Sequence, residues 1–589
     1  MRSLFILVAF AAVLFPESAV EAIQQGDADE SLAVLIADER AFYYQENPGT
    51  GPRDKPRPIA KSMRRVSPDD QQRRTEVFQG FLNRLQQIDP NHLDDVGRLN
   101  HQMLGYKLNS NLLFLQHRTW RVPFFSDSGF HTSPARMWRG ITFRKAEDYR
   151  AYIERLKDLP RYLAEHEANL RLGMAEGFTM PKVVLDGLLP TFQAQISETA
   201  ETSSLYVPFL ELATGVSEID AAQLRGQAQL VITAQVMPAY ERVAAFMEQE
   251  YYPAAREAIG ASSLPMGADY YGAMVRYYTT LDVTPDEVHQ LGLSEVARIR
   301  AEMETVIQQS GFEGSFAEFL AFLRSDPQFY AKSEKELLMF ASYIAKKIDG
   351  GVPKLFGKLS RQPYGVEAVP ASIAPNYTTG RYLSAPLDAP RGGAYWVNTY
   401  ALDKRPLYTI PALTLHEAVP GHHLQIALAA ELEDVPEFRL DTYPHAFGEG
   451  WGLYAEKLGL ELDIYETPYD HFGRLSYEMW RACRLVIDTG IHAKGWTRDQ
   501  AIRLLEENSA LSTHNIRTEV DRYISWPGQA LAYKMGELKI LELRKRATEA
   551  LGDKFDVRDF HDRVLSAGGI PLYLLEERIN SWISEQKQK

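Results

Sequence analysis

The chain has 589 residues, of which 45% are hydrophobic and 24% charged, and its net charge is −14. This composition is typical of a globular protein that buries a large core, and the length allows about three to five domains or one large helical body with two lobes. A negative chain without a dense run of Lys and Arg repels phosphate, which argues against a nucleic-acid-binding protein.

The first 22 residues have the pattern of a secretory signal peptide. Arg2 precedes the apolar run LFILVAFAAVLF, and the small residues of SAVEA predict cleavage after Ala22. The apolar run is shorter than the roughly 20 residues that span a bilayer, so we expect no membrane span after cleavage. No cysteine follows it, and the single cysteine, Cys483, is expected to pack as a small hydrophobic residue. We therefore predict a periplasmic or secreted protein.

Most of the mature chain has helical patterning. Apolar residues recur at steps of three and four in EVFQGFLNRLQQI, in EDYRAYIERLKDL and in TPDEVHQLGLSEVARIRAEM. The last of these begins with Thr284 as N-cap and Pro285 in the first turn, and Gly311 suits its end. We predict an N-terminal helical region, residues 23–349, and a catalytic region, residues 350–589, in one continuous fold.

Residues 350–400 differ, because prolines and glycines separate short β-prone runs. These runs are KLFGKLS, YGVEAVPAS, GRYLSAP and GGAYWVNTY, and they predict a small antiparallel sheet. One interpretation is that AYWVNT is an edge strand that holds an extended peptide by main-chain hydrogen bonds. The other is that the sheet only caps the helical body.

The segment LTLHEAVPGHHLQ resembles a zinc-binding HExxH helix with altered spacing. In HExxH the two histidines lie four residues apart, on one face of the helix. Here His416 is followed by Glu417, but the position four residues after His416 is Pro420, and the next histidines are His422 and His423. In a regular helix His422, six residues after His416, points to roughly the opposite side. His423, seven residues after His416, lies on the same face but about 10.5 Å along the axis. Neither pair can share one zinc ion on a regular helix.

Pro420 and Gly421 supply a reason for the helix to be irregular at this point. Proline has no N–H to donate to the carbonyl of His416 and its ring clashes with it, and glycine permits conformations closed to other residues. We predict a bulge at residues 419–421 that brings a later histidine back to the metal. The alternative is a helix that ends at Val419, with exposed histidines after it.

A third ligand is predicted in HAFGEGWGLYAEKLGLEL. Glu449 lies 33 residues after His416 in a setting typical of zinc peptidases that take a glutamate from a second helix. Glu456 lies two turns later on the same face. We expect it to be an exposed partner of a nearby lysine rather than a contact of a metal ligand.

Three segments, HEAVPGHHLQ, GEGWGLYAE and DRYISWPGQALAYKMGEL, resemble in sequence and order the bacterial family catalogued as domain of unknown function 885, and GAYWVNTY before them fits as well. The resemblance covers most of the mature chain. It implies a Glu-zincin peptidase, similar in architecture to angiotensin-converting enzyme and dipeptidyl peptidase III. It also implies a mainly α fold: a large two-lobed helical body with a deep cleft and a small antiparallel sheet next to the zinc-binding helix.

The resemblance assigns the metal site. Dipeptidyl peptidase III is similar in lengthening the motif, and alignment on "GH" makes His422 the second ligand, with His423 as its rival. One Zn²⁺ per chain is then held by His416, His422 and Glu449, and Glu417 is the general base for a metal-activated water.

The remaining site residues are predicted less directly. Related architectures are similar in placing a C-terminal tyrosine over the metal, which favours Tyr523 as the donor to the oxyanion. Arg517, Tyr533 and His423 are candidate substrate contacts.

The predicted function is an exported zinc metallopeptidase that hydrolyses short peptides. One alternative is a metal-dependent hydrolase of a non-peptide amide or ester. The other is a non-catalytic binding protein that keeps the fold. The presence of Glu417 argues against the second alternative, because binding alone does not require a base.

Overall fold

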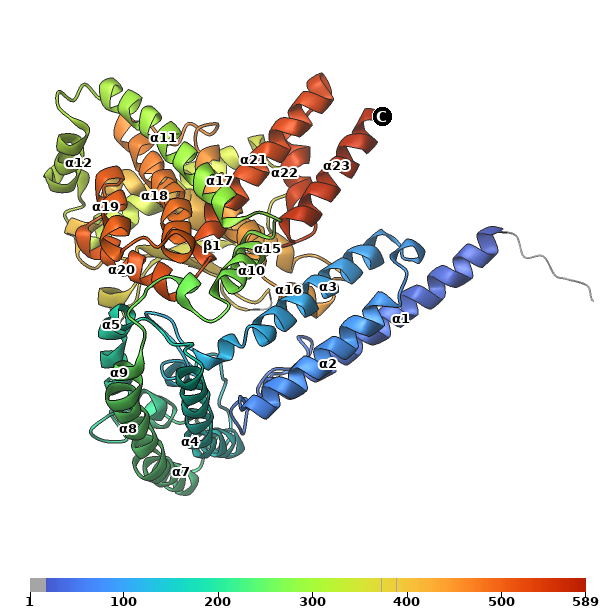
Figure 1. The fold of residues 1–589 in the computed structure, drawn as a ribbon, viewed down its shortest axis with the longest axis vertical. Helices are drawn as coiled ribbons and strands as arrows, with labels where there is room; N and C mark the ends of the chain where they lie inside the picture. Colours follow the sequence, from blue (N-terminus) through green and yellow to red (C-terminus); the bar gives the residue numbers. More distant parts are fainter. Residues whose placement is uncertain (1–16, 372, 388, 589) are drawn as a thin grey trace, which may run out of the picture.

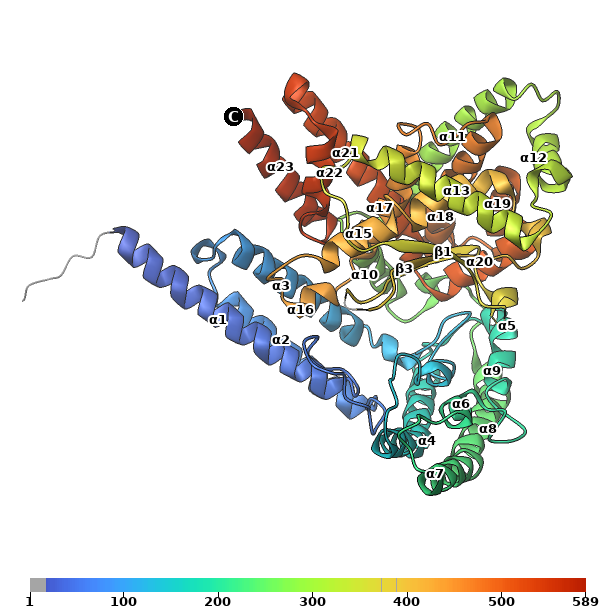
Figure 2. The ribbon, with the colours of Figure 1, turned by 180° about the vertical axis from the view of Figure 1, so that it is seen from behind.

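The computed structural model describes residues 17–371, 373–387 and 389–588 of the chain. Its regular structure is mainly helical, with three short strands in one small sheet (Figures 1 and 2), which confirms the predicted mainly α fold. The predicted signal peptide, residues 1–22, lies mostly outside the described residues. Among the helices of the described ranges, none has the length and apolar character needed to cross a membrane.

The N-terminal part begins with three long helices that lie side by side as an arm (blue in Figure 1). Side-chain caps fix where two of them begin: Ser67 accepts a hydrogen bond from Asp70 N–H, and Asp94 accepts one from Gly97 N–H. The helices are α1 (Glu17–Glu46), α2 (Pro68–Gln86) and α3 (Asp95–Gln116).

A second group of helices follows the arm (teal and green in Figure 1). Its longest member, α4, buries a face rich in Leu and Tyr against the others. Two π-helical segments, Ile232–Val236 and Met247–Tyr251, join the last three helices end to end. The helices are α4 (Ala146–Ala175), α5 (Lys182–Gln193), α6 (Val207–Leu210), α7 (Glu218–Val231), α8 (Met237–Phe246) and α9 (Tyr252–Ala254).

The helix predicted from Thr284 onward is confirmed. Thr284 and Glu287 form a capping box, Pro285 occupies the first turn, and Gly311 has φ +73° just after the helix ends. This helix belongs to a third group: α10 (Gly267–Thr279), α11 (Pro285–Gln309), α12 (Phe316–Ser325) and α13 (Glu334–Gly351).

The C-terminal helices surround α18, which is buried along almost its whole length and contains Cys483, 0% exposed. The helix α11 packs along α18, and α17 packs along α21. One hydrophobic cluster therefore contains residues from both sides of the predicted boundary at residue 350. The helices are α14 (Ile410–Glu417), α15 (His422–Ala430), α16 (Glu437–Leu440), α17 (His445–Leu458), α18 (Pro468–Lys494), α19 (Arg498–Asn508), α20 (Thr513–Ser525), α21 (Ala532–Leu551), α22 (Val557–Leu565) and α23 (Leu572–Gln588).

The sheet lies between α13 and α14, where a small sheet was predicted, but it is mixed rather than antiparallel. Its strands are β1 (Tyr364–Ala368), β2 (Gly380–Leu383) and β3 (Gly393–Val397), in the order β1-β3-β2. Strand β3 pairs antiparallel with β2 and parallel with β1.

Two further expectations for the sheet were wrong. The segment AYWVNT contains the central strand β3, so both of its edges are paired and it cannot be an edge strand. The edge strand beside α14 is β2. KLFGKLS forms no strand, because a 3₁₀ turn at Val352–Lys354 carries the chain out of α13 into a loop.

Candidate metal centre

The lengthened motif folds as two helices with a break between them, as the sequence predicts. Helix α14 ends at Glu417 and α15 begins at His422. Across the break His423 N–H donates to Ala418 O at 3.1 Å, and the indole of Trp451 donates to Pro420 O at 2.8 Å. The break is therefore held from both sides by specific hydrogen bonds.

Glycine at position 421 is favoured by its conformation and required by space. Its torsion angles, φ −74° and ψ −130°, lie outside the main α and β regions, as the sequence suggested. A Cβ at this position would also lie 2.0 Å from His416 O and 2.4 Å from Leu415 O. The chain can return against the end of α14 only where no side chain is present.

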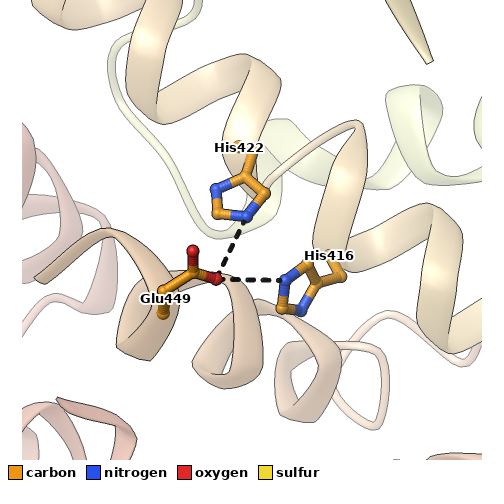
Figure 3. Close-up of side chains that lie close together, drawn as sticks. All are labelled: His416, His422 and Glu449. Carbon is orange, nitrogen blue, oxygen red and sulfur yellow. Dashed lines mark ion pairs between the residues drawn. The ribbon is translucent and has the colours of Figure 1, made fainter. Parts of the chain in front are cut away.

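The break brings three predicted ligands together (Figure 3). The side chains of His416, His422 and Glu449 come from α14, α15 and α17, and one ligand atom from each lies within 4.8 Å of the other two. The Glu449 carboxylate is 3.7 Å from Nε2 of His422 and 4.0 Å from Nε2 of His416. His423 is not part of this cluster.

This arrangement fits a zinc ion. Two imidazole nitrogens and one carboxylate oxygen are a ligand set that zinc accepts, with an open fourth position. At zinc bond lengths of 2.0–2.1 Å, tetrahedral ligand atoms lie about 3.4 Å apart, so the three atoms, which lie within 4.8 Å of one another, would move inward on binding one ion. Burial, reinforced by His422, lowers the pKa of His416 to about 3, which leaves the imidazole in the neutral form that binds metals.

The charge of the third ligand also favours a cation. Burial alone would raise the pKa of Glu449, but the neighbouring His422 and His416 outweigh it and hold the pKa of this carboxyl below its ordinary value. The side chains of the three residues are 5%, 12% and 17% exposed in the order His416, His422, Glu449. The centre is thus nearly enclosed but reachable.

Glu456 positions the first ligand, and the expectation that it is an exposed ion-pair partner was wrong. It is 1% exposed, and its Oε1 lies 2.8 Å from Nδ1 of His416. This contact directs Nε2 of His416 toward Glu449, as carboxylates commonly do for metal-binding histidines. Burial raises the pKa of Glu456 to about 8, against the opposing effect of Arg481, whose guanidinium is 3.7 Å away.

Gly452 makes room for the same histidine. A Cβ on this residue would lie 2.7 Å from Cε1 and 2.8 Å from Nε2 of His416. Helix α17 thus supplies Glu449, and Gly452, three residues later, lets the imidazole of His416 approach the helix. Part of the GEGWG motif is explained by this contact.

Glu417, the predicted base, lies directly after the first ligand at the end of α14. Its carboxylate accepts a hydrogen bond of 2.7 Å from the backbone N–H of Tyr382 in the edge strand β2. One carboxylate oxygen is therefore fixed by the sheet. The sheet beside the metal helix has a role in the site that the sequence did not indicate.

Tyr443 is a neighbour of the metal centre that the sequence did not single out. Tyr443 is 42% exposed, and its hydroxyl lies against α17 at Gly448, where an added Cβ would be 2.2 Å away. Its ring lies 5.3 Å from that of His445, one turn before Glu449. The only sequence signal was its place a few residues before GEGWG, among the 30 tyrosines of the chain.

The remaining predicted residues make contacts with other parts of the chain. His423 is 1% exposed, and its two ring nitrogens face Tyr382 Oη at 2.9 Å and Ser360 Oγ at 3.4 Å. Tyr523 is 1% exposed, and its hydroxyl accepts hydrogen bonds from Trp480 and Arg484 of α18.

Tyr533 and Arg517 also lie at the C-terminal end of the chain. The guanidinium carbon of Arg484 lies 4.5 Å from the centroid of the Tyr533 ring, and that of Arg481 lies 6.0 Å from the same centroid. Arg481 in turn contacts Glu456. Arg517 is exposed on α20.

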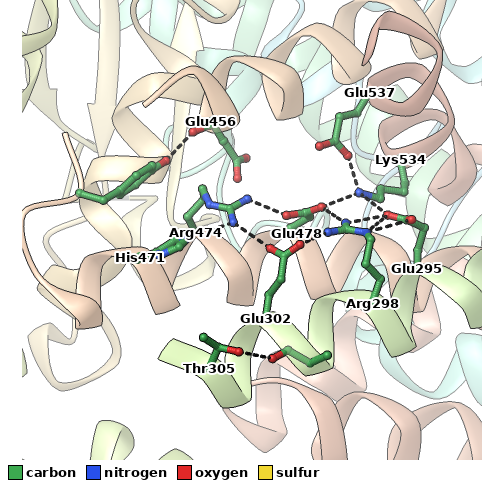
Figure 4. Close-up of polar contacts among 12 residues, drawn as sticks. Glu295, Arg298, Glu302, Thr305, Glu456, His471, Arg474, Glu478, Lys534 and Glu537 are labelled. Atoms are coloured by element: carbon green, nitrogen blue, oxygen red, sulfur yellow. Dashed lines mark hydrogen bonds and ion pairs between the residues drawn. The ribbon is translucent and has the colours of Figure 1, made fainter. Parts of the chain in front are cut away.

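A buried cluster of charges supports the helices behind the metal centre (Figure 4). Lys534 of α21 is 0% exposed, and its Nζ lies 2.6 Å from Glu537, 2.8 Å from Glu478 and 3.0 Å from Glu295. Arg298 of α11 also contacts Glu478. We call these five residues the Lys534 cluster. It joins α11, α18 and α21, so Lys534 is a structural residue and not an exposed one.

The fold and the site together define a mainly helical protein with a two-histidine, one-glutamate cluster at a break between two helices. The profile of the family described as "Bacterial protein of unknown function (DUF885)" matches residues 49–579. The chain therefore belongs to this family, as its motifs predicted.

Solved structures share the fold. A crystal structure described as a "putative lipoprotein" from Colwellia psychrerythraea is 28% identical, with a TM-score of 0.87 over 95% of this chain and 99% of that chain. A second, a "putative lipoprotein of unknown function" from Shewanella oneidensis, is 16% identical, with a TM-score of 0.70 over 96% and 99%. None of the curated proteins compared matches the chain.

Proposed function

We propose that this protein is a zinc-dependent peptidase that hydrolyses short peptides, of the Glu-zincin kind. The observation that carries the proposal is the convergence of His416, His422 and Glu449 despite an irregular motif, with Glu417 adjacent. The break depends on Pro420, Gly421 and two specific hydrogen bonds. Burying three unrelated side chains would require none of these features, so the break supports a shared role for the three residues.

The residues of the chain have distinct roles in this proposal. His416, His422 and Glu449 hold one zinc ion, which when bound lowers the pKa of water and polarises a carbonyl. Glu417 takes a proton from the attacking water and passes it to the leaving amine, while Tyr382 N–H orients its carboxylate.

We further propose that the protein is exported. The N-terminal pattern of residues 1–22 supports export, and so do relatives described as putative lipoproteins. The only cysteine of the chain is Cys483, buried in α18, so lipid attachment at an N-terminal cysteine is not part of the proposal.

The metal proposal is tested by elemental analysis of purified protein. We expect about one zinc ion per chain in the wild type, and none in His416→Ala. His514→Ala removes an exposed histidine of α20 and is expected to keep the metal. A wild-type protein with no affinity for zinc would refute the proposal.

The peptidase proposal is tested by digestion of a peptide library. We expect Glu417→Gln to keep its zinc and to lose about 10²- to 10⁴-fold in rate, the usual contribution of a general base. Glu433→Gln, which changes an exposed glutamate after α15, is the matched control. Equal rates for Glu417→Gln and the wild type would exclude Glu417 as the base. Hydrolysis of amides or esters without any cleavage of peptides would favour the alternative hydrolase.

A further inference from the structure

A large cavity is lined in part by Tyr278, whose ring packs against His445 at the start of α17. Its volume is about 520 Å³, within the range of small-molecule sites, and it is bounded by α2, α3, α10 and the turn at residues 526–527. Its wall is mostly apolar and aromatic. Of the described residues that line it, three are arginines and none is Asp or Glu, although the chain as a whole carries a charge of −14.

One of these arginines is partly buried and has no carboxylate partner among the described residues. Arg74 is neutralised by Glu46 at 2.7 Å, and Arg64 is exposed to solvent. By contrast, Arg256 is half-buried and donates only to neutral oxygens, among them Thr179 O and Gly260 O at 2.8 Å, and its Nη2 donates to no described residue. A partly desolvated guanidinium without a counter-charge is costly, and a bound anion would offset that cost.

The apolar part of the wall is built from flat rings. Phe125 and Trp526 stack with centroids 4.3 Å apart, and Phe114, Trp120 and Tyr278 lie on the same wall. Such a surface favours a large apolar or aromatic group. The cavity therefore suits a ligand that combines such a group with a negative charge.

The wall of the cavity also contacts α17, the helix that carries Glu449. Tyr278 accepts a hydrogen bond from the indole of Trp526, and its ring lies 5.1 Å from that of His445. His445 begins α17 and lies one turn before the ligand Glu449. A molecule that fills the cavity would thus lie beside the metal-binding helix.

We infer that this cavity binds the carboxyl-terminal end of the substrate. Arg256 holds the free α-carboxylate, and the aromatic wall receives a large apolar last side chain. The inference rests on the proposed peptidase function and narrows it to peptides with a free, apolar carboxyl terminus.

Binding can be measured without catalysis, on the full-length protein. The probes are N-acetylphenylalanine and its uncharged amide, followed by calorimetry and by the fluorescence of Trp120 and Trp526. We expect the acid to bind at least about 10-fold more tightly than the amide, the value of one hydrogen bond between charged groups. In the variant Arg256→Gln this preference is expected to disappear.

Arg225→Gln is the matched control, because Arg225 also donates to a backbone carbonyl, Phe209 O, but does not line the cavity. It is expected to keep the preference for the acid. Equal affinity of the wild type for acid and amide, or no binding of either, would overturn the inference whether or not Arg256→Gln folds. Selective binding of the acid without peptide hydrolysis would refute only the peptidase function, and hydrolysis without selective binding would refute only the cavity assignment.

Discussion

Replacing Gly452 by alanine is expected to damage the metal site while leaving its helix intact. The added Cβ would lie 2.7 Å from Cε1 of His416, whereas carbon atoms in contact are about 3.5 Å apart. The imidazole must therefore move by about 0.8 Å, several times the roughly 0.2 Å that a metal–ligand distance tolerates. Disturbing the residues that orient metal ligands typically costs about 10- to 100-fold in affinity, and we expect at least this loss.

The affinity is measured by competition for zinc with a chromophoric chelator, and thermal unfolding is recorded with and without zinc. Gly226→Ala is the control, because Gly226 also lies within a helix, α7, and its Cβ would meet nothing within 4 Å. It is expected to leave zinc affinity unchanged and to stabilise the helix by up to about 1 kcal/mol. If Gly452→Ala bound zinc as tightly as the wild type, the positions of His416 and α17 described above would be refuted as the geometry of a metal site.

Two further predictions concern stability. Lys534→Met leaves three buried carboxylates of the Lys534 cluster without their shared cation, so we expect chemical denaturation to show a loss of about 3–5 kcal/mol. Lys545→Met, at a position 76% exposed on the same helix, is expected to change the free energy of unfolding by less than about 0.5 kcal/mol, and equal effects of the two would contradict this account. Stability should also fall as the pH is lowered from about 6.5 towards 3. Burial lowers the pKa of His131, His166 and His492 to about 3, so over this range they take up protons only when the chain unfolds. Denaturation at a series of pH values measures how steeply the free energy of unfolding changes with pH.

The break in the motif could be predicted because its cause is local. Pro420 cannot donate a hydrogen bond to the carbonyl of His416, and only a return of the chain could then bring His422 to the face of His416. The helix from Pro285 to Gln309 was equally predictable, because the residues that cap its start and those that end it lie directly beside it in the sequence.

Features that depend on distant segments were not predictable in this way. The role of Glu456 follows from how α17 lies against α14, and a glutamate in a helix gives no sign of that contact. The order of the strands was missed for the same reason. Strand β1 pairs with β3 although β2 lies between them in the sequence, and short strands carry little pattern. The need for Gly421 was foreseen from its conformational freedom, but the sequence could not show the close contact that a Cβ would make with the backbone of His416 and Leu415.

The Lys534 cluster has a consequence for the order in which the protein can assemble during its synthesis. Arg298 and Glu478, which contact each other, are separated by 180 residues, and the lysine that they surround comes later still. Arg298 and Arg474 can pair with the acidic groups of α11 and α18 once these two helices exist, but Lys534, the buried cation that Glu295 and Glu478 share, is present only when α21 has been made. We expect a nascent chain that stops before α21 to hold all three metal ligands in its sequence and yet to lack the scaffold that brings them together.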